Sequence, residues 1–90
     1  MNIKSHLRKV INLLQKGWCR YNGRRKINGK NHYCVTGAAH KTSKNAYLLI
    51  DKLNEISLRE KQRNIVAFND AAKNKREVIG FLRKCEKEIN

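Results

Sequence analysis

The sequence predicts a mainly α-helical domain with a short β-hairpin-like excursion between its first and second helices; an α+β fold is the alternative. Two stretches near the ends of the chain carry apolar residues at helical spacing, and a glycine-rich segment with two Asn-Gly pairs follows the first of them. The 90 residues, 40% of them apolar, are enough for one modest core. Neither an internal repeat nor a flexible linker is visible. We therefore expect residues 1–90 to form a single domain.

The first predicted element is a helix of about four turns near the N-terminus. Its apolar stripe consists of Ile3, Leu7, Val10, Ile11 and Leu14. A basic ridge on the opposite face contains Lys4, Arg8, Lys9 and Lys16. Because Lys16 gives a basic last turn and Gly17 is suited to a left-handed cap, we expect the helix to end there.

The glycine-rich segment 17–33 is expected to form a hairpin or an irregular β-like excursion. Asn-Gly favours positive φ at both central positions of a tight turn, so Asn22-Gly23 and Asn28-Gly29 predict two sharp chain reversals. Cations beside these turns would lie at an exposed tip that suits contact with phosphates. They are Arg20, Arg24, Arg25, Lys26 and Lys30.

Three aromatic residues of this segment are candidates for stacking. Tyr21 and Tyr33 can stack on unpaired bases, as aromatic side chains do in single-strand and RNA binders. If the partner is a protein, the same two tyrosines are expected hot spots. Trp18 can stack too, but a lone tryptophan in a small domain gains most from burial, so we expect it to anchor the core.

The middle of the chain predicts two further helical elements. Residues 34–40 are rich in small side chains, which is typical of a tightly packed helical turn. Thr42 or Ser43 is expected to cap the next helix. The apolar stripe of that helix consists of Ala46, Leu49, Ile50, Leu53 and Ile56. Residues 57–64 then form either a solvated connection or a continuation of the helix.

The C-terminal part predicts a short helix and a long one. The apolar run 65–68 ends at Asn69-Asp70, and we favour a helix over a strand for it. Asn74 followed by Glu77 resembles a capping box and predicts the start of an amphipathic helix. Its apolar stripe consists of Val78, Phe81, Leu82, Cys85 and Ile89.

Several short motifs resemble those of a family of small bacterial and phage proteins known only as a domain of unknown function. The family pattern is a Trp, then C-x-x-G-A, then W-N-D or F-N-D, followed by a helix. Its counterparts here, between residue 18 and about residue 88, are Trp18, Cys34-x-x-Gly37-Ala38 and Phe68-Asn69-Asp70. The resemblance implies a compact, mainly helical fold with a polar turn at Asn69-Asp70, and it implies no activity. We expect a structural role for Trp18, Cys34, Gly37, Asn69 and Asp70.

The distribution of charge is the strongest functional signal, and it departs from the acidic or neutral character common in that family. Residues 1–50 contain eleven Lys or Arg and no acidic residue, whereas residues 51–90 contain ten basic and seven acidic residues. The two segments therefore contribute +11 and +3 to the net charge of +14. Because such self-repulsion costs stability, it favours a polyanionic partner: DNA, RNA or an acidic protein face. A generic basic surface is the plain alternative.

A zinc site and cysteine chemistry are the alternatives to a purely binding role. The candidate zinc ligands are Cys19, His32, Cys34 and His40, but their spacing lacks the close pairs of structural zinc sites. Cys34 can act as a nucleophile if a histidine serves as base and Asn69-Asp70 as orienter, yet packing and turn formation already explain these residues. The P-loop, G-x-G-x-x-G and H-E-x-x-H motifs are absent. We expect no metal, no cofactor and no catalysis.

The sequence favours a cytoplasmic protein. No stretch approaches the roughly 18 apolar residues that cross a bilayer, and the N-terminus lacks the continuous apolar core of a signal peptide. The first helix has neither Trp nor Phe on its apolar stripe, so we expect no membrane binding. Thiols in a reducing compartment are expected for Cys19, Cys34 and Cys85.

Two functional hypotheses follow. The first is a basic accessory or regulatory protein that binds DNA or RNA with weak sequence preference, encoded by a phage or mobile element, as the many Lys, Asn and Ile residues suggest. The second is a phage-type inhibitor of an acidic or nucleic-acid-handling host complex, such as a defence system, polymerase or nuclease. In the first hypothesis the phosphate-binding residues are Lys4, Arg8, Lys9, Lys16, Arg20, Arg24, Arg25, Lys26 and Lys30.

Overall fold

The computed structural model describes residues 2–21 and 23–89. Within these residues it contains five helices and one two-stranded antiparallel sheet, which confirms the mainly α-helical fold and the hairpin between the first two helices. In chain order the elements are α1 (Ile3–Lys16), β1 (Arg24–Ile27), β2 (Lys30–Tyr33), α2 (Val35–Thr42), α3 (Tyr47–Lys61), α4 (Ile65–Ala71) and α5 (Lys75–Glu88).

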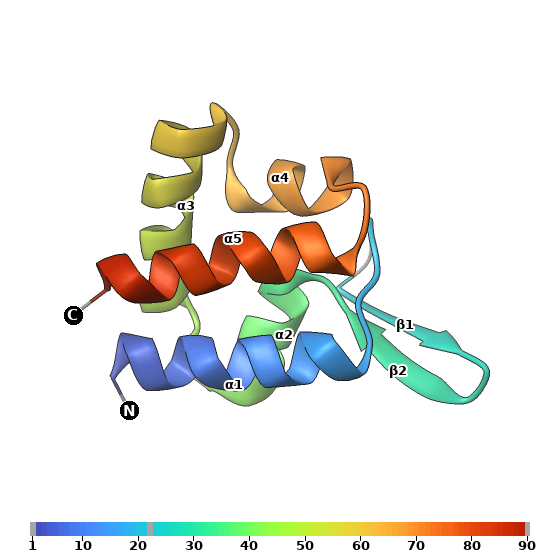
Figure 1. Cartoon of the computed structure of the whole chain (residues 1–90). Coiled ribbons are helices and arrows are strands. Elements are labelled where there is room, and N and C mark those ends of the chain that lie inside the picture. The colour runs from blue at the N-terminus through green and yellow to red at the C-terminus, as the bar shows by residue number, and fades with distance from the viewer. Residues whose placement is uncertain (1, 22, 90) are drawn as a thin grey trace.

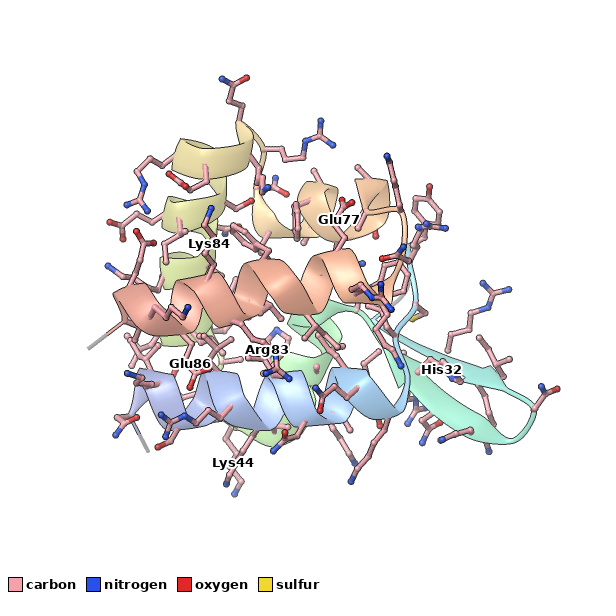
Figure 2. All side chains as sticks on the ribbon, in the orientation of Figure 1. His32, Lys44, Glu77, Arg83, Lys84 and Glu86 are labelled. Carbon is pink, nitrogen blue, oxygen red and sulfur yellow. The ribbon has the colours of Figure 1, made fainter. Side chains whose placement is uncertain are left out.

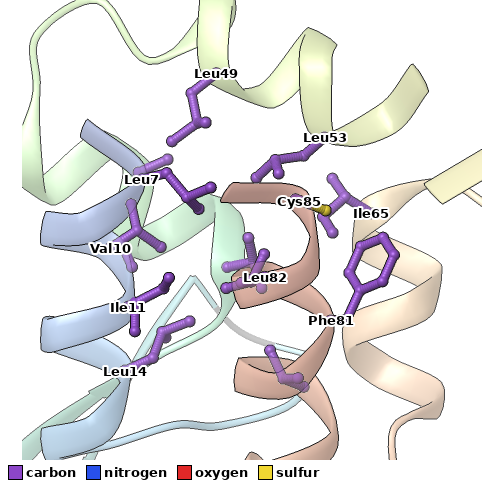
Figure 3. Close-up of a cluster of buried hydrophobic side chains, with 14 of the residues drawn as sticks. Leu7, Val10, Ile11, Leu14, Leu49, Leu53, Ile65, Phe81, Leu82 and Cys85 are labelled. Carbon is purple, nitrogen blue, oxygen red and sulfur yellow. The ribbon is translucent and has the colours of Figure 1, made fainter. Parts of the chain in front are cut away.

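Helices α1 and α5 run antiparallel and side by side; α2 lies behind them, and α3 and α4 pack together on the side of α5 away from α1 (Figure 1). The hairpin projects beyond the C-terminal end of α1 (Figure 1). The apolar stripes predicted for α1, α3 and α5 all enter one core, with Ile3 packed half-buried at its edge (Figure 3). The largest apolar side chains in the centre of this core are Leu7, Leu14, Leu49, Leu53, Ile65 and Leu82.

Helix α1 ends at Lys16, as predicted, but Gly17 does not form the predicted left-handed cap. Gly17 has φ −178° and ψ 117°, an extended conformation that continues toward the hairpin. Its lack of a side chain serves close packing instead, because a Cβ atom would lie 2.7 Å from the carbonyl oxygen of Asn31. The glycine therefore lets strand β2 approach the end of α1.

The prediction that Thr42 or Ser43 caps the third helix is wrong. The N-cap of α3 is Ala46, which makes no side-chain capping hydrogen bond. The Thr42 hydroxyl donates instead to the carbonyl of Ala38 at 2.7 Å, within the last turn of α2. Ser43 follows as the C-cap of α2. Helix α3 continues to Lys61, which decides between the two alternatives left open for the segment after Ile56.

Helix α4 is present as favoured, and it extends further than expected. The Asn64 side chain caps it by accepting a hydrogen bond from the Ala67 amide at 2.8 Å. Asn69 and Asp70 lie inside this helix, so the polar turn that the resemblance implied at these residues is wrong. The side chains of both residues form hydrogen bonds with other segments of the chain, which explains how two polar residues are accommodated in a partly buried helix.

The start of α5 and the hairpin turn follow their local sequence signals. The Asn74 side chain accepts a hydrogen bond from the Glu77 amide at 3.0 Å, as in the predicted capping box. Asn28 and Gly29 have φ of 51° and 77° and form the two-residue turn between β1 and β2, as predicted. Asn22, the first member of the other predicted Asn-Gly reversal, lies outside the described residues.

Candidate nucleic-acid interface

The β1–β2 hairpin presents cations on both of its faces. Residues directly opposite in an antiparallel ladder share a face, and the register pairs Arg24 with Tyr33 and Lys26 with Asn31 on one face. The other face carries Arg25 opposite His32, next to Ile27 opposite Lys30. The cationic side chains of the hairpin are all exposed: Arg24, Arg25, Lys26 and Lys30. The predicted basic tip is thus a cationic ribbon.

The foot of the hairpin is fastened to the segment that follows α1. The Tyr33 amide donates to the carbonyl of Gly17, and the Cys19 amide donates to the carbonyl of Tyr33, both at 3.0 Å. The Tyr33 side chain is 5% exposed and joins the core. The ribbon therefore projects from a fixed base.

Asn69 joins the segment after α1 to the start of α2. Its Oδ1 accepts hydrogen bonds from Trp18 Nε1 at 2.9 Å and from the Val35 amide at 3.1 Å. Its Nδ2 donates to the carbonyl of Cys19 at 3.2 Å. Asp70 adds a further link, because its Oδ1 accepts from the Tyr21 amide at 2.8 Å. These two residues of α4 thus position the chain that leads into β1.

Cys34 and Gly37 pack the hairpin against α2. The Cys34 Sγ accepts a hydrogen bond from the Gly37 amide at 3.3 Å and so caps the N-terminus of α2. The Cys34 amide donates to the carbonyl of Gly23 at 3.3 Å. A Cβ atom at Gly37 would lie 1.8 Å from that same Gly23 oxygen, so only glycine fits there. Five residues of the family pattern are therefore brought together around the base of the hairpin: Trp18, Cys34, Gly37, Asn69 and Asp70.

Arg20 does not belong to the exposed tip where the sequence placed it. Its guanidinium donates two hydrogen bonds to the carbonyl of Ala72, at 2.6 and 3.0 Å, and one to that of Lys73 at 2.8 Å. The same group lies 5.2 Å from the centre of the Trp18 ring. Because these contacts occupy the guanidinium, Arg20 fastens the α4–α5 connection to the foot of the hairpin.

Three cations near this foot were missed by the sequence analysis. Lys73, just before α5, and Lys75 and Arg76, in its first turn, are exposed, and this end of α5 lies next to the end of α1. Lys75 Nζ donates to the carbonyl of Gln15 at 2.9 Å, which ties the two helix ends together. No local pattern links residues about 60 positions apart, so no sequence signal could have found them. We call Lys16, Lys73, Lys75 and Arg76 the basal collar.

The predicted basic ridge of α1 is divided between two surroundings. Arg8 pairs with Glu86 of α5, and this hydrogen-bonded arginine lowers the pKa of the Glu86 carboxyl. Figure 2 shows Glu86 and Arg83 directed to the surface between α5 and α1. Lys9 and Lys16 remain exposed away from the core. The depression between the two helices is lined by Lys4, Arg8, Arg83, Glu86 and Lys87.

The structure separates the three aromatic residues considered for stacking. Tyr33 is buried, and Trp18 is half-buried with its indole nitrogen bonded to Asn69. Tyr21 is 76% exposed. Only Tyr21 among the three therefore offers a largely open ring face.

The residues weighed for zinc and cysteine chemistry have other partners. No group of three or more metal-ligating side chains occurs in the described part of the chain. The Cys34 Sγ lies 3.2 Å from the Thr36 hydroxyl, and the His40 ring packs against Tyr47 with centroids 5.5 Å apart. Burial raises the pKa of the Cys19 thiol and raises that of Cys85 to about 12, which opposes thiolate formation.

Among the described residues, no helix is long and apolar enough to span a bilayer.

Comparison with known proteins places the chain in a family. Residues 1–88 match the profile of a family of unknown function, DUF6197. No curated protein and no solved structure shows a significant match to the chain.

Proposed function

The chain belongs to the family DUF6197, and we propose that it is a small nucleic-acid-binding accessory or regulatory protein that performs no catalysis. The family brings no activity, so the proposal rests on the surface of this chain. The hairpin is the principal contact element, and the exposed cations of α1 extend the contact. Phosphate contacts of this kind give affinity that depends strongly on salt and little on base sequence.

The observation that carries the proposal is the lack of acidic partners for the hairpin cations. Across residues 2–21 and 23–89, the ion pairs involve Arg8, Lys52 and Arg59, and none involves a residue of β1 or β2. Four cations on a ribbon of eight strand residues repel one another, and a polyanion removes that repulsion. The fixed base of the ribbon also limits the entropy lost when it binds.

The test is a fluorescence-anisotropy titration of labelled single-stranded and duplex DNA and RNA at about 50 and 200 mM salt. It compares the wild type with the triple variant R24A/R25A/K26A. A matched control, K41A/K44A/K84A, removes the same charge from exposed lysines elsewhere; Figure 2 shows Lys44 and Lys84 far from the hairpin. The control separates the position of the charge from its amount.

We expect the hairpin variant to lose affinity on the order of a hundredfold, since each lost charge-assisted contact contributes about 1 kcal/mol or more. The slope of log K against log salt should become shallower by about three units, one for each contact. The control variant should keep most of the affinity. Equal losses in both variants, or no binding of any polymer at low salt, would overturn the proposal; the latter would favour an acidic protein partner.

A further inference from the structure

We infer that the preferred polymer is duplex DNA and that the β1–β2 hairpin enters its major groove while the basal collar contacts the flanking phosphates. This inference rests on the proposed function and names the substrate class of the same surface. Four observations support it: the dimensions of the ribbon, the cations on both of its faces, the scarcity of exposed aromatic rings near the hairpin, and the position of the collar.

The dimensions of the hairpin match those of the major groove of B-DNA. Each strand has four residues, so the ribbon is about 13 Å long at roughly 3.3 Å per residue. The major groove of B-DNA is about 12 Å wide and about 8.5 Å deep, and it admits a two-stranded ribbon. The ribbon is therefore long enough to reach the base edges while its foot stays outside the groove.

Both faces of the ribbon carry cations that can contact the phosphate backbones on either side of a groove. One face carries Arg24, Lys26 and Asn31, and the other carries Arg25 and Lys30. A ribbon inserted edge-on between two phosphate backbones needs cations on both sides, whereas a ribbon lying flat on a surface needs them on one. The alternation along β1 supplies both sides at once.

The aromatic side chains argue against a single-stranded partner. Proteins that bind single strands without sequence preference stack successive bases on several aromatic rings. Here Tyr33 is 5% exposed, and Trp18 is covered by the Arg20 guanidinium. Tyr21 alone does not form a platform for successive bases, and the other largely exposed ring, Tyr47, lies on α3 against His40. The remaining chemistry of the hairpin is that of phosphate and groove contact.

The shape of the ribbon also discriminates between the two duplexes. A-form RNA has a deep, narrow major groove that side chains cannot read, and its wide minor groove is shallow. A ribbon with long side chains on both faces fits the wide major groove of B-DNA, but it is too thick for the narrow major groove of A-form RNA. Duplex RNA is therefore expected to bind only through its surface phosphates.

The collar is held where the edges of the groove would lie. The Arg20 bond to the Lys73 carbonyl and the Lys75 bond to the Gln15 carbonyl fix the beginning of α5 at the foot of the hairpin. Two acidic residues lie near the collar: Asp70, whose Oδ1 accepts hydrogen bonds from the Tyr21 amide and from Asn69, and Glu77, which is exposed in the first turn of α5 beside Phe68 and Ala71 of α4. With the ribbon in the groove, these exposed residues at its foot would be the cations nearest to the flanking backbone phosphates.

The test measures the affinity for single-stranded DNA, duplex DNA and duplex RNA of one sequence. It adds displacement by methyl green, a major-groove ligand, and by netropsin, a minor-groove ligand. We expect duplex DNA to bind at least tenfold more tightly than the other two polymers and to be released by methyl green but not by netropsin. Preference for another polymer, or release by netropsin alone, would overturn the inference and leave the proposed function standing.

A charge-neutral variant isolates the geometry of the ribbon. Gly29 has φ 77°, and a Cβ there would meet no atom within 4 Å, so Gly29→Val strains the turn without a clash. We expect G29V to lose about tenfold in affinity for duplex DNA and to keep its affinity for single-stranded DNA. Equal affinities of G29V and wild type for duplex DNA would overturn the groove geometry.

A variant of the basal collar tests whether its cations contact the flanking phosphates. K73A/K75A/R76A should make the salt slope for duplex DNA shallower by about three units while displacement by methyl green persists. An unchanged slope would overturn the role of the collar. The failure of every polymer to bind would overturn the proposed function itself, whereas the other results of the polymer, displacement, G29V and collar experiments bear on the groove inference alone.

Discussion

Asn69 shows how one buried amide organises a surface at a distance. Its side chain is 1% exposed, and it bonds to Trp18, to the Val35 amide and to the Cys19 carbonyl. These partners belong to the segment before the hairpin and to the helix after it. Because a buried polar group without a partner costs free energy, removing this amide leaves several groups unsatisfied at once. Asn69 therefore positions the hairpin by holding the segments before and after it, without itself lying on the surface.

Replacing this amide should destabilise the fold. We expect Asn69→Ala to lower the free energy of unfolding by about 3 kcal/mol, because it leaves an indole nitrogen, an amide and a carbonyl without their partner. Urea denaturation monitored by circular dichroism measures this change. Asn12→Ala, on the exposed face of α1, should stay within about 0.5 kcal/mol of wild type. A loss below about 1 kcal/mol for Asn69→Ala would contradict this account of the network.

At the scale of the elements, α2 is short and depends on tertiary contacts more than on its own propensity. A helix of eight residues is marginal in isolation, and its sequence carries a low share of large apolar side chains. It is held by the Cys34 cap at its start and by contacts with α1 and α4. Gly37 lets its first turn touch Gly23, next to β1. The hairpin and α2 therefore form one packed unit.

Two glycines in helices should respond to alanine in opposite directions. Gly37→Ala should destabilise the protein by about 3 kcal/mol or more, because its Cβ would overlap the Gly23 carbonyl. Gly80→Ala, in α5 with open space at its Cβ position, should stabilise it by about 0.5 to 1 kcal/mol. Thermal and urea unfolding of both variants measure the difference. Similar effects of the two substitutions would rule out the close contact at Gly37.

At the scale of the whole molecule, the ion pairs are unevenly distributed. Where α3 approaches the end of α5, Arg59 pairs with Glu60 and with Glu88, and Lys84 and Lys87 lie beside them. The hydrogen bonds to Glu88 and Glu60 raise the pKa of Arg59. The hairpin and the collar lie toward the other end of α5 (Figure 1), and no ion pair among the described residues involves a cation of β1 or β2. If the partner is a polyanion, as proposed, these cations would favour its approach to the hairpin end of the molecule.

Net repulsion should make the stability depend on salt. With a net charge of +14, we expect the melting temperature to rise by several degrees when NaCl screens the cations, since about 1 kcal/mol shifts it by roughly 4 to 8 °C in a domain of this size. Calorimetry at low and moderate NaCl measures the shift. R24A/R25A/K26A should melt higher than wild type at low salt and show a smaller salt effect. A fall in melting temperature with salt would mean that the ion pairs outweigh the repulsion.

The sequence by itself determined the features that are local. The stripes of α1, α3 and α5, the Asn28-Gly29 turn and the Asn74 cap follow from periodicity and from backbone preferences within a few residues, and each is present in the structure. The exposure of the hairpin cations follows likewise, because a two-residue turn between short polar strands has nothing to bury them.

Only the tertiary structure decided the features that join distant segments. It placed Asn69 and Asp70 inside a helix, since partners about 35 to 50 residues away satisfy their side chains. It turned Arg20 from a tip cation into a brace, buried Tyr33, and added Lys73, Lys75 and Arg76 to the hairpin foot. The physical reason is that these side chains act through hydrogen bonds and close packing between elements, whereas periodicity records only which face of its own element a residue occupies.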